Sequence, residues 1–315
     1  MKSFLVTGGC GFVGSHLADA LVARGHRVRI LDDLSAGRRA NAPAKAEVIV
    51  GDVAESATVR RAAAGMDGCF HLAAIPSVQR SVEGWLPTHR VNLGGTINVL
   101  DAAHAAGAIP VVYASSAAVY GDQRELPLAE AAPLAPQSPY GADKAASELH
   151  AHAAFVVRGV PNTGLRMFHV YGPRQDPASP YSGVISIFTE NLLAGRPLPI
   201  FGDGKQSRDF VFVSDVVAAL LAAMERQDSS ARIFNVGRGE RITLLRLIAA
   251  LERITARKAL VRHEPPRLGD DPHLQSDTTR AKGGLGFTAK VGLEEGLASL
   301  VGWLNADKTV PARSA

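Results

Sequence analysis

Three residues near the middle of the chain have the types and spacing needed to move a proton. Tyr140 and Lys144 are four residues apart in a predicted helix, so their side chains lie on one helical face, one turn apart. A tyrosine has an ordinary pKa near ~10 and is a poor base at neutral pH, but a neighbouring ammonium favours the phenolate. Ser116 follows an apolar run that predicts a strand, and its hydroxyl could hydrogen-bond the oxygen that loses the proton. Read alone, the Tyr-x-x-x-Lys spacing is more often a helix surface pair, so the surrounding elements decide its meaning.

The elements around these residues predict an α/β fold with a doubly wound parallel sheet of the Rossmann type. The first half of the chain alternates helical segments with continuous Val, Ile and Leu runs, as strands buried on both faces do. Ligands bind such sheets at the carboxyl ends of the strands, which is where Ser115 and Ser116 fall. The expected strands are Ser3–Val6, Arg27–Leu31, Ala46–Val50, Gly68–Leu72 and Ile109–Ala114, with Thr163–Met167 completing the sheet.

A glycine-rich turn, Thr7–Gly14, connects the first strand to the first helix. Gly8 allows a tight turn, Gly11 lets a dinucleotide pyrophosphate approach the backbone, and Gly14 lets the helix pack closely on the strand. The helix N-terminus then faces the phosphates with free N–H groups. Asp32 ends the second apolar run, eighteen residues after Gly14, where an acid can accept hydrogen bonds from the adenosine ribose. The pattern predicts a dinucleotide site, against the alternative of a glycine loop that only turns the chain.

Later strand ends and one helix add detail to this site. Asp52 follows the third strand, where an acid either meets an adenine amino group or caps the next helix, and both interpretations stay open. The small residues of His71–Ala74 either let a cofactor lie across the strand ends or simply pack closely. A long helix is expected from about Pro87 to Gly107. Because Gly94 and Gly95 each weaken it by about 1 kcal/mol, we expect a close packing partner there.

Composition excludes several classes of protein. The chain has 315 residues, of which 46% are hydrophobic and 20% charged, as in an ordinary globular protein. Its net charge of +4 is dispersed, with no basic run interleaved with aromatics, so nucleic acid is not favoured as a partner. The cysteines, Cys10 and Cys69, are far apart, and His150 and His152 lie on different helical faces, so neither a metal site nor a disulfide is expected.

The same features favour a cytoplasmic protein. The cysteine usage fits a reducing compartment, and the N-terminus leads directly into the first strand, which leaves no room for a signal peptide. No apolar run approaches the ~18 residues that a membrane span requires, so no membrane partner is expected.

Taken together, Thr7–Gly14, Ser115–Gly121 and Ser138–Lys144 resemble motifs of the extended short-chain dehydrogenases/reductases, in the group of nucleotide-sugar epimerases and dehydratases. The resemblance covers nearly the whole chain and is strongest to the UDP-hexose 4-epimerases. It implies an NAD cofactor and gives Ser116, Tyr140 and Lys144 the catalytic roles. The other matching motifs are Leu31–Ser35, Gly51–Val53, His71–Ala74, Arg166–Pro173, Ser207–Val211 and Arg267–Asp270.

The resemblance also implies a division of the chain and a set of ligand contacts. An NAD-binding Rossmann domain would cover residues 1–168, with 209–236 returning to it, and a smaller nucleotide-sugar lobe would cover 169–208 and 237–315. The implied NAD contacts are Gly8, Gly11, Phe12, Val13, Gly14, Asp32, Asp33, Leu34, Ser35, Gly37, Asp52, Val53, Leu72, Ala73, Ala74, Asn92, Ala114, Tyr140, Lys144 and Phe168. The implied substrate contacts are Ser77, Val78, Ser116, Tyr140, His169, Arg208, Arg267, Asp270 and Leu274.

In the implied reaction, Tyr140 takes the proton of a sugar hydroxyl while a hydride leaves the same carbon for NAD, and Ser116 holds the oxygen. The 4-keto sugar rotates and the hydride returns to its other face, so no net redox change occurs. The rotation needs a fixed anchor, which arginines gripping the nucleoside diphosphate would supply. The candidates are Arg208 and Arg267, with Asp270 on the uridine ribose.

Three departures from the family pattern affect the substrate site. Dehydratases of this group carry an Asp-Glu pair where this chain has Ala117-Ala118, so dehydration is disfavoured. The 4-epimerases usually have Asn at the position of His169, and often Gly at that of Pro76, which precedes Ser77 and Val78 on the sugar side. At Leu274 the family varies a residue of the pocket wall, where tyrosine narrows the pocket and serine or cysteine admits an acetamido group.

Other readings of the function remain open. Within the same group, the chain could be a uronate 4-epimerase, a uronate decarboxylase or a ketosugar reductase. In a different class, it could be an NAD-binding sensor or scaffold without catalysis, against which the intact Ser116, Tyr140 and Lys144 argue. The small, Ala-rich faces of Asn92–His104 and Tyr140–Phe155 predict a homodimer, because family members commonly pair through these helices; the alternative is that both faces pack internally.

Overall fold

The computed structural model of the chain describes residues 1–175, 183–227, 230–265 and 273–309. Its centre is a seven-stranded parallel sheet in the order β11-β6-β5-β4-β1-β2-β3. This is the doubly wound arrangement predicted from the apolar runs, and all five residues of β1 are buried. The strands are β1 Ser3–Thr7, β2 Arg27–Asp32, β3 Glu47–Val50, β4 Gly68–His71, β5 Val111–Ser116, β6 Asn162–Met167 and β11 Ala231–Val236.

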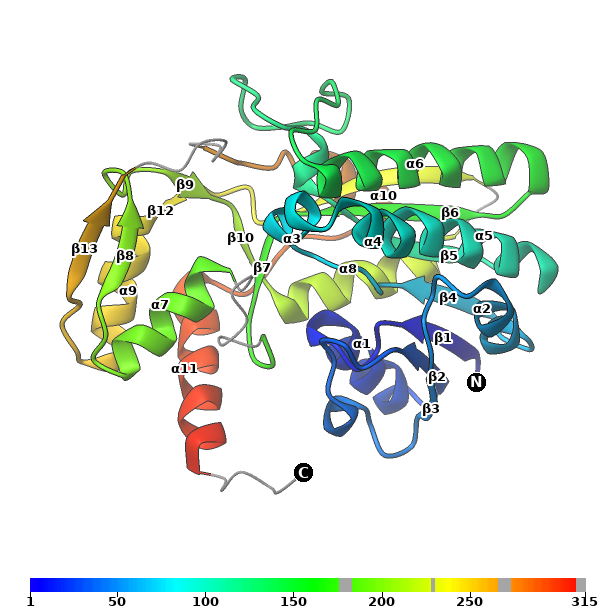
Figure 1. The fold of residues 1–315 in the computed structure, drawn as a ribbon, viewed down its shortest axis with the longest axis horizontal. Helices are drawn as coiled ribbons and strands as arrows, with labels where there is room; N and C mark the ends of the chain where they lie inside the picture. Colours follow the sequence, from blue (N-terminus) through cyan, green and yellow to red (C-terminus); the bar gives the residue numbers. More distant parts are fainter. Residues whose placement is uncertain (176–182, 228–229, 266–272, 310–315) are drawn as a thin grey trace.

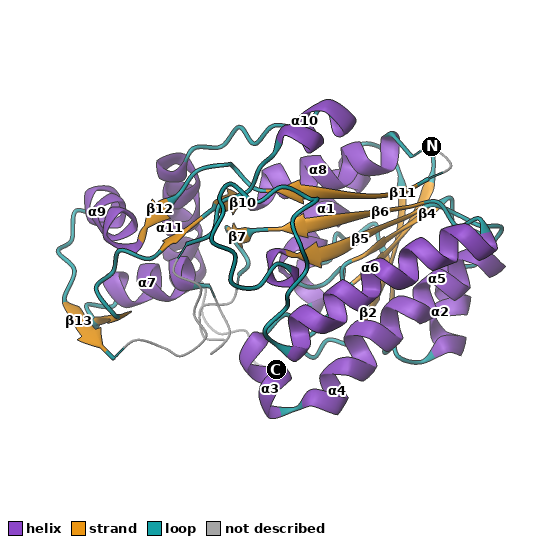
Figure 2. Cartoon of the chain, turned by 90° about the horizontal axis from the view of Figure 1, so that it is seen from above, coloured by secondary structure: helices purple, strands orange, loops and turns teal. Residues whose placement is uncertain are grey.

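Helices cover both faces of this sheet, as Figure 2 shows. One face packs on α1, α8 and α10, in a core that contains Leu17, Phe70 and Val216. The other face packs on α2, α5 and α6, around Leu5 and Val99. Within the described ranges, no helix is both long and apolar enough to cross a membrane. These helices are α1 Phe12–Ala23, α2 Ser56–Ala63, α5 Gly95–Ala105, α6 Pro139–Arg158, α8 Val213–Glu225 and α10 Thr279–Leu285.

A smaller lobe lies beyond the carboxyl ends of the central strands (Figure 1). Its own core includes Phe188, Leu247 and Leu300, which come from three different helices. Three two-stranded sheets accompany them: β8 with β13, β9 with β12, and β7 with β10. The elements are β7 His169–Tyr171, α7 Val184–Leu193, β8 Leu198–Phe201, β9 Ser207–Arg208, β10 Phe210–Phe212, β12 Ile242–Thr243, α9 Leu244–Thr255, β13 Val261–Glu264 and α11 Leu293–Thr309.

The predicted boundaries differ from the observed ones in two places that matter for the site. The fifth strand extends two residues further than expected, so Ser115 and Ser116 are its last residues. The expected long helix consists of α4 Trp85–His89, a π-helical turn Arg90–Gly94 and α5, and a separate α3, Val78–Glu83, precedes it. The close packing expected at the glycine pair occurs at Gly95, where an added Cβ would lie 2.7 Å from Cγ2 of Val53.

Candidate active site

The three residues selected for proton transfer meet at the carboxyl end of β5. Ser116 ends this strand, and Tyr140 and Lys144 lie on the first turns of α6. The Tyr140 hydroxyl is hydrogen-bonded to Ser116. The Lys144 Nζ lies 5.9 Å from the centroid of the Tyr140 ring and donates to the Ala114 carbonyl at 2.8 Å. The helical spacing and the strand end therefore brought together the groups that the sequence analysis paired.

Burial controls the ionisation of both groups on α6. It raises the pKa of Tyr140, and the hydrogen bond to Ser116 opposes this rise. Burial also lowers the pKa of Lys144 from 10.5 to about 8, against the opposing charges of Asp143 and Glu148. In the protein alone, burial is thus the larger effect on the Tyr140 pKa. The expectation that the Lys144 ammonium, together with the positive nicotinamide ring of NAD, favours the phenolate stays a prediction.

A buried polar network joins α6 to the sheet one turn beyond Lys144. The Arg166 guanidinium on β6 makes a two-pronged ion pair with Glu148, at 2.9 and 2.7 Å. Its Nη1 donates to the Tyr120 hydroxyl at 2.9 Å, and Tyr120 donates to Asn235 on β11 at 2.6 Å. Ser115 on β5 donates to Glu148 at 2.5 Å. Sequence reasoning did not pair Arg166 with Glu148, although a charged residue inside a strand with a buried pattern indicates a paired charge.

The glycine turn has the shape that a dinucleotide needs. Gly8 has a φ of +69°, and a Cβ on it would lie 2.7 Å from the Ala73 nitrogen. A Cβ on Gly14 would lie 2.1 Å from the Gly8 carbonyl oxygen, so the close helix packing expected there is confirmed. The first turn of α1, with Phe12 and Val13, has neither a capping side chain nor an acidic residue, so its N–H groups can face a phosphate. These features fit NAD.

The loop after β2 lies beside this turn. The Asp32 carboxylate is buried and accepts the N–H groups of Cys10 and Leu34, both at 2.9 Å, which leaves each oxygen further acceptor capacity. Gly37 packs against Cys10 and Asp32, where a Cβ would lie 2.8 Å from the Cys10 carbonyl carbon. In the same loop, Asp33 accepts both the N–H and the hydroxyl of Ser35. The placement supports an acid next to the adenosine end of the turn.

The segments that follow β3 and β4 are held by contacts with the π-helical turn Arg90–Gly94. The Asp52 carboxylate accepts the Ala54 N–H at 2.8 Å and pairs with Arg90 at 2.8 Å. It does not cap α2, whose N-cap is Glu55, so that alternative is wrong. Asn92 is buried, and its amide binds both the N–H and the carbonyl of Ile75. Asn92 thereby supports the loop that follows Leu72, Ala73 and Ala74, and its expected contact with NAD stays a prediction.

On the substrate side, His169 and Arg208 are neighbours. Burial and the charge of Arg208 lower the pKa of His169 to about 3, so the imidazole is neutral. Its Nδ1 is buried and has no hydrogen-bond partner among the described residues. Arg208 is buried on β9 and donates to the Ser207 carbonyl at 3.0 Å. His169 can therefore offer a phosphate a neutral donor and no charge.

The remaining substrate candidates divide into three groups. Leu274 is buried in a cluster with Ala117, next to Ser116, and with Phe168. Ser77 is buried and caps α3 by accepting the Arg80 N–H at 3.1 Å, and Val78 follows it, exposed. Two of the expected contacts, Arg267 and Asp270, lie outside the described residues.

Asp209, which sequence reasoning did not select, holds Arg208 in place. Its buried carboxylate accepts the N–H groups of Arg238, Gly239 and Ser276 at 2.8 to 2.9 Å, and the Ser276 hydroxyl at 2.5 Å. Its carbonyl accepts the His169 N–H at 3.0 Å. Within the described ranges, no group of three His, Cys, Asp or Glu side chains could hold a metal ion.

Comparison with known proteins agrees with this geometry. A UDP-glucose 4-epimerase of Mycolicibacterium smegmatis is 40% identical over 304 residues, which cover 94% of this chain and 96% of that protein. UDP-glucuronic acid decarboxylase 1 of Arabidopsis thaliana is 33% identical over 308 residues, covering 94% and 68%. The structure of a Thermotoga maritima UDP-glucose 4-epimerase with UDP-glucose matches with a TM-score of 0.93 and 36% identity, over 97% of this chain and 99% of that chain. Residues 4–237 match the NAD dependent epimerase/dehydratase family, and the chain therefore belongs to this family, whose cofactor is NAD.

Proposed function

We propose that this protein inverts the configuration at carbon 4 of a UDP-hexose of the UDP-glucose and UDP-galactose type. The observation that carries the proposal is the meeting of Ser116, Tyr140 and Lys144 at the end of β5, beside the glycine turn. The similarity to UDP-glucose 4-epimerases over nearly the whole chain supports the same reaction. We further infer that residues 1–168, with 209–236, hold NAD, and that 169–208 and 237–315 hold the sugar nucleotide.

The chain's own residues would move one proton and hold the substrate. Bound NAD supplies a hydride acceptor that can return the hydride. The Tyr140 phenolate accepts the proton from the hydroxyl on carbon 4, and later returns it to the oxygen of the keto sugar. Ser116 donates to that oxygen, and Lys144 stabilises the phenolate by its charge. Arg208, held by Asp209, binds the diphosphate while the sugar turns, with His169 as a neutral donor beside it.

The turn after Ser116 argues against dehydration. Ala117 and Ala118 begin the short 3₁₀ helix Ala117–Val119, in which the Ser116 hydroxyl accepts the Ala118 N–H at 3.2 Å. Methyl groups at these two positions cannot supply the carboxylates that elimination of water needs. A uronate decarboxylase remains the second candidate, because the Arabidopsis relative is named for that reaction.

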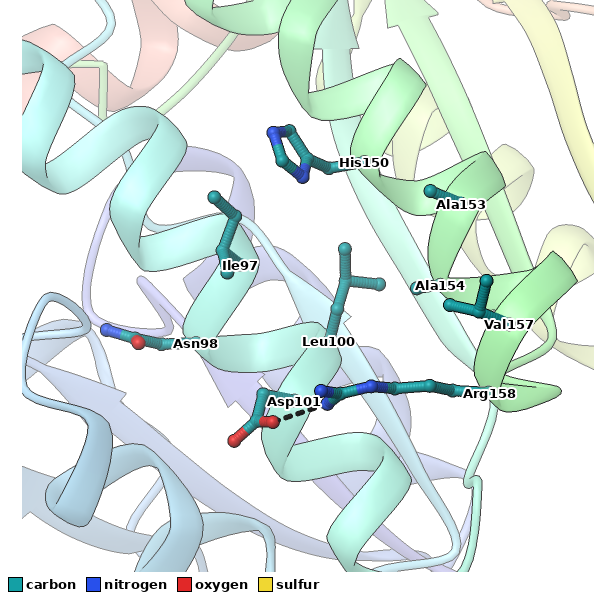
Figure 3. A pocket seen from close by; sticks show the side chains of 9 residues that line it. All are labelled: Ile97, Asn98, Leu100, Asp101, His150, Ala153, Ala154, Val157 and Arg158. Atoms are coloured by element: carbon teal, nitrogen blue, oxygen red, sulfur yellow. Dashed lines mark hydrogen bonds and ion pairs between the residues drawn. The ribbon is translucent and has the colours of Figure 1, made fainter.

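We also propose a homodimer through α5 and α6. A groove runs between these helices, lined by Ile97, Leu100 and Val157 together with the Asp101–Arg158 ion pair (Figure 3). Leu149, Val156 and Val157 on α6 are 65 to 74% exposed, an unusual exposure for large aliphatic side chains that lie on one helix. A second copy of the same face would cover them.

The test of the reaction is a panel of sugar nucleotides analysed by NMR. The purified protein is incubated separately with UDP-glucose, UDP-galactose, their N-acetyl forms, UDP-glucuronate and dTDP-glucose. We expect interconversion of UDP-glucose and UDP-galactose without added NAD. A pentose product from UDP-glucuronate would instead support the decarboxylase, and a 4-keto-6-deoxy product would support a dehydratase. Retention of NAD with no conversion of any substrate would favour the non-catalytic sensor.

A further inference from the structure

The catalytic helix α6 begins with an unusual hydrogen bond from another helix. Its first residue, Pro139, has no N–H, so Tyr140 carries the first backbone donor of the helix. The Oγ of Ser81 on α3 accepts this Tyr140 N–H at 3.1 Å. The next donor, the Gly141 N–H, is accepted by the Ser138 side chain at 3.1 Å. The backbone of the catalytic tyrosine is thus capped by a residue 59 positions earlier in the chain.

The Ser81 hydroxyl is itself held in one orientation. Ser81 has no exposed surface, and its hydroxyl donates to the Val78 carbonyl within α3 at 2.6 Å. The hydrogen is therefore engaged inside α3, and the oxygen lone pairs face α6. A buried hydroxyl with both roles filled is a rigid acceptor, because any rotation would break the bond to Val78.

A second contact joins α6 to α4, one turn of α6 after the contact at Tyr140. The Asp143 Oδ1 on α6 lies 2.8 Å from the His89 Nδ1 on α4. Asp143 is buried and stands between Tyr140 and Lys144 in the sequence, so this contact fixes the rotation of the turn that carries both. Figure 1 shows α3 and α4 lying along α6. Together the two contacts align the first turns of α6 with the end of β5.

We propose that Ser81 is a positioning residue for Tyr140, whose hydroxyl fixes the backbone of the tyrosine and so keeps the phenol within hydrogen-bond reach of Ser116. Only the expected change in kcat rests on the proposed function. Loss of a helix cap destabilises the helix end, which lets the first turn move. Small displacements of a catalytic group have large kinetic effects, up to about a hundredfold for 1 Å.

The test is Ser81→Ala, studied as the NAD-loaded enzyme. We expect kcat to fall by about tenfold or more, with KM and the NAD content within about twofold of wild type. We also expect the Tyr140 pKa to rise further, because the Ser116 bond that opposes the effect of burial is weakened. The titratable side chains that face this turn, Lys144, Asp143 and His89, are unchanged in the variant. Tyrosine labelled with ¹³C at Cζ reports the pKa by NMR titration, and Tyr140→Phe assigns the signal.

A matched control is Ser3→Ala. Ser3 is also buried, and its hydroxyl accepts a hydrogen bond from Arg27 Nε at 2.9 Å at the amino end of β1, opposite the strand ends that carry the site. We expect this variant to leave both kcat and the Tyr140 signal unchanged. If Ser81→Ala fails to fold, Ser81→Cys keeps the shape of the side chain and replaces the oxygen with a weak acceptor, and the same results are expected.

Three results would overturn the proposal. One is an unchanged kcat and Tyr140 titration in Ser81→Ala, and another is an equal loss in Ser3→Ala. The third is a loss of NAD with unchanged turnover per bound cofactor, which would make Ser81 a support of the cofactor site only. If the wild type converts no sugar nucleotide, the proposed function fails, but the Tyr140 titration still decides the role of Ser81.

Discussion

Tyr140 and Lys144 show, at the scale of single residues, how burial and charge oppose each other. Both are ionisable groups on one helical face, and burial disfavours the charged form of each. The Lys144 ammonium donates a hydrogen bond to the neutral Ala114 carbonyl, and Tyr140 is hydrogen-bonded to Ser116. The protein therefore holds a pair whose charge states respond strongly to whatever binds beside them.

Removal of the phenol oxygen tests the proton transfer directly. We expect Tyr140→Phe to lower the turnover of UDP-glucose by at least about a hundredfold, since general acid and base catalysis contributes effects of that size. NAD should remain bound, because the ring and its packing persist. Steady-state rates and the NAD released on denaturation measure the two effects. A variant within about fivefold of wild type would remove Tyr140 from the mechanism.

The pH dependence of stability should report the buried ammonium. The Lys144 pKa is lowered from 10.5 to about 8 in the folded protein. Between these values the unfolded chain binds more protons, so the stability of wild type rises with pH relative to a variant without the amine. We expect wild type to gain about 2–3 kcal/mol over Lys144→Met between pH 7 and pH 10. Urea unfolding of both proteins, freed of cofactor, measures this difference, and a gain of the opposite sign would contradict it.

The residue at position 274 should select among sugars. Leu274 is buried beside Ala117 and Phe168, so a larger side chain must displace its neighbours. We expect Leu274→Tyr to cost about 1–3 kcal/mol of strain and to penalise N-acetylhexoses more than plain hexoses. The measurement is the ratio of kcat/KM for UDP-N-acetylglucosamine to that for UDP-glucose. An unchanged ratio would mean that Leu274 does not form the pocket wall.

At the scale of elements, α6 is held at several points along its length. Ser81 and His89 contact its first turns, and the Arg166–Glu148 ion pair ties its middle to β6. Asp209 holds the small-lobe strand that carries Arg208 against the loop at Arg238. The elements that carry reacting groups are therefore fixed mainly by polar contacts between layers, within a core that supplies the apolar packing.

The buried ion pair between Arg166 and Glu148 should stabilise the folded protein. Arg166→Met leaves the Glu148 carboxylate buried without its cation, and we expect the free energy of unfolding to fall by about 3–5 kcal/mol. The control is Arg24→Met, which breaks an exposed ion pair with Glu225 and should change stability by at most about 1 kcal/mol. Urea midpoints compare the stability of the two variants. Equal losses would show that the buried ion pair contributes no more to stability than the exposed one.

At the scale of the whole molecule, the exposed face of α5 and α6 predicts the oligomeric state. We expect the mass of a homodimer by light scattering at micromolar concentration. Leu149→Glu places a charge on the 69% exposed position and should give monomers. Leu260→Glu, at a 61% exposed position next to β13 in the small lobe, is the matched control and should leave the dimer intact. A monomeric wild type would end the proposal.

Much of the fold and the central site followed from local sequence patterns. The apolar runs predicted the parallel sheet, because strands buried on both faces need continuous hydrophobic residues. The glycines of Thr7–Gly14 predicted the close approach of helix and strand, which depends only on side-chain size. The four-residue spacing of Tyr140 and Lys144 predicted their common face, because helical geometry is local.

The contacts that complete the site depended on the tertiary structure. Ser81 meets Tyr140, and Arg166 meets Glu148, only because the sheet brings distant segments together. The neutral state of His169 and the raised pKa of Tyr140 depend on burial, which no spacing in the chain encodes. Sequence patterns therefore determined the elements and the residues that could react, whereas the packing of layers decided their partners and charges, since desolvation and hydrogen bonding act between groups close in space rather than in sequence.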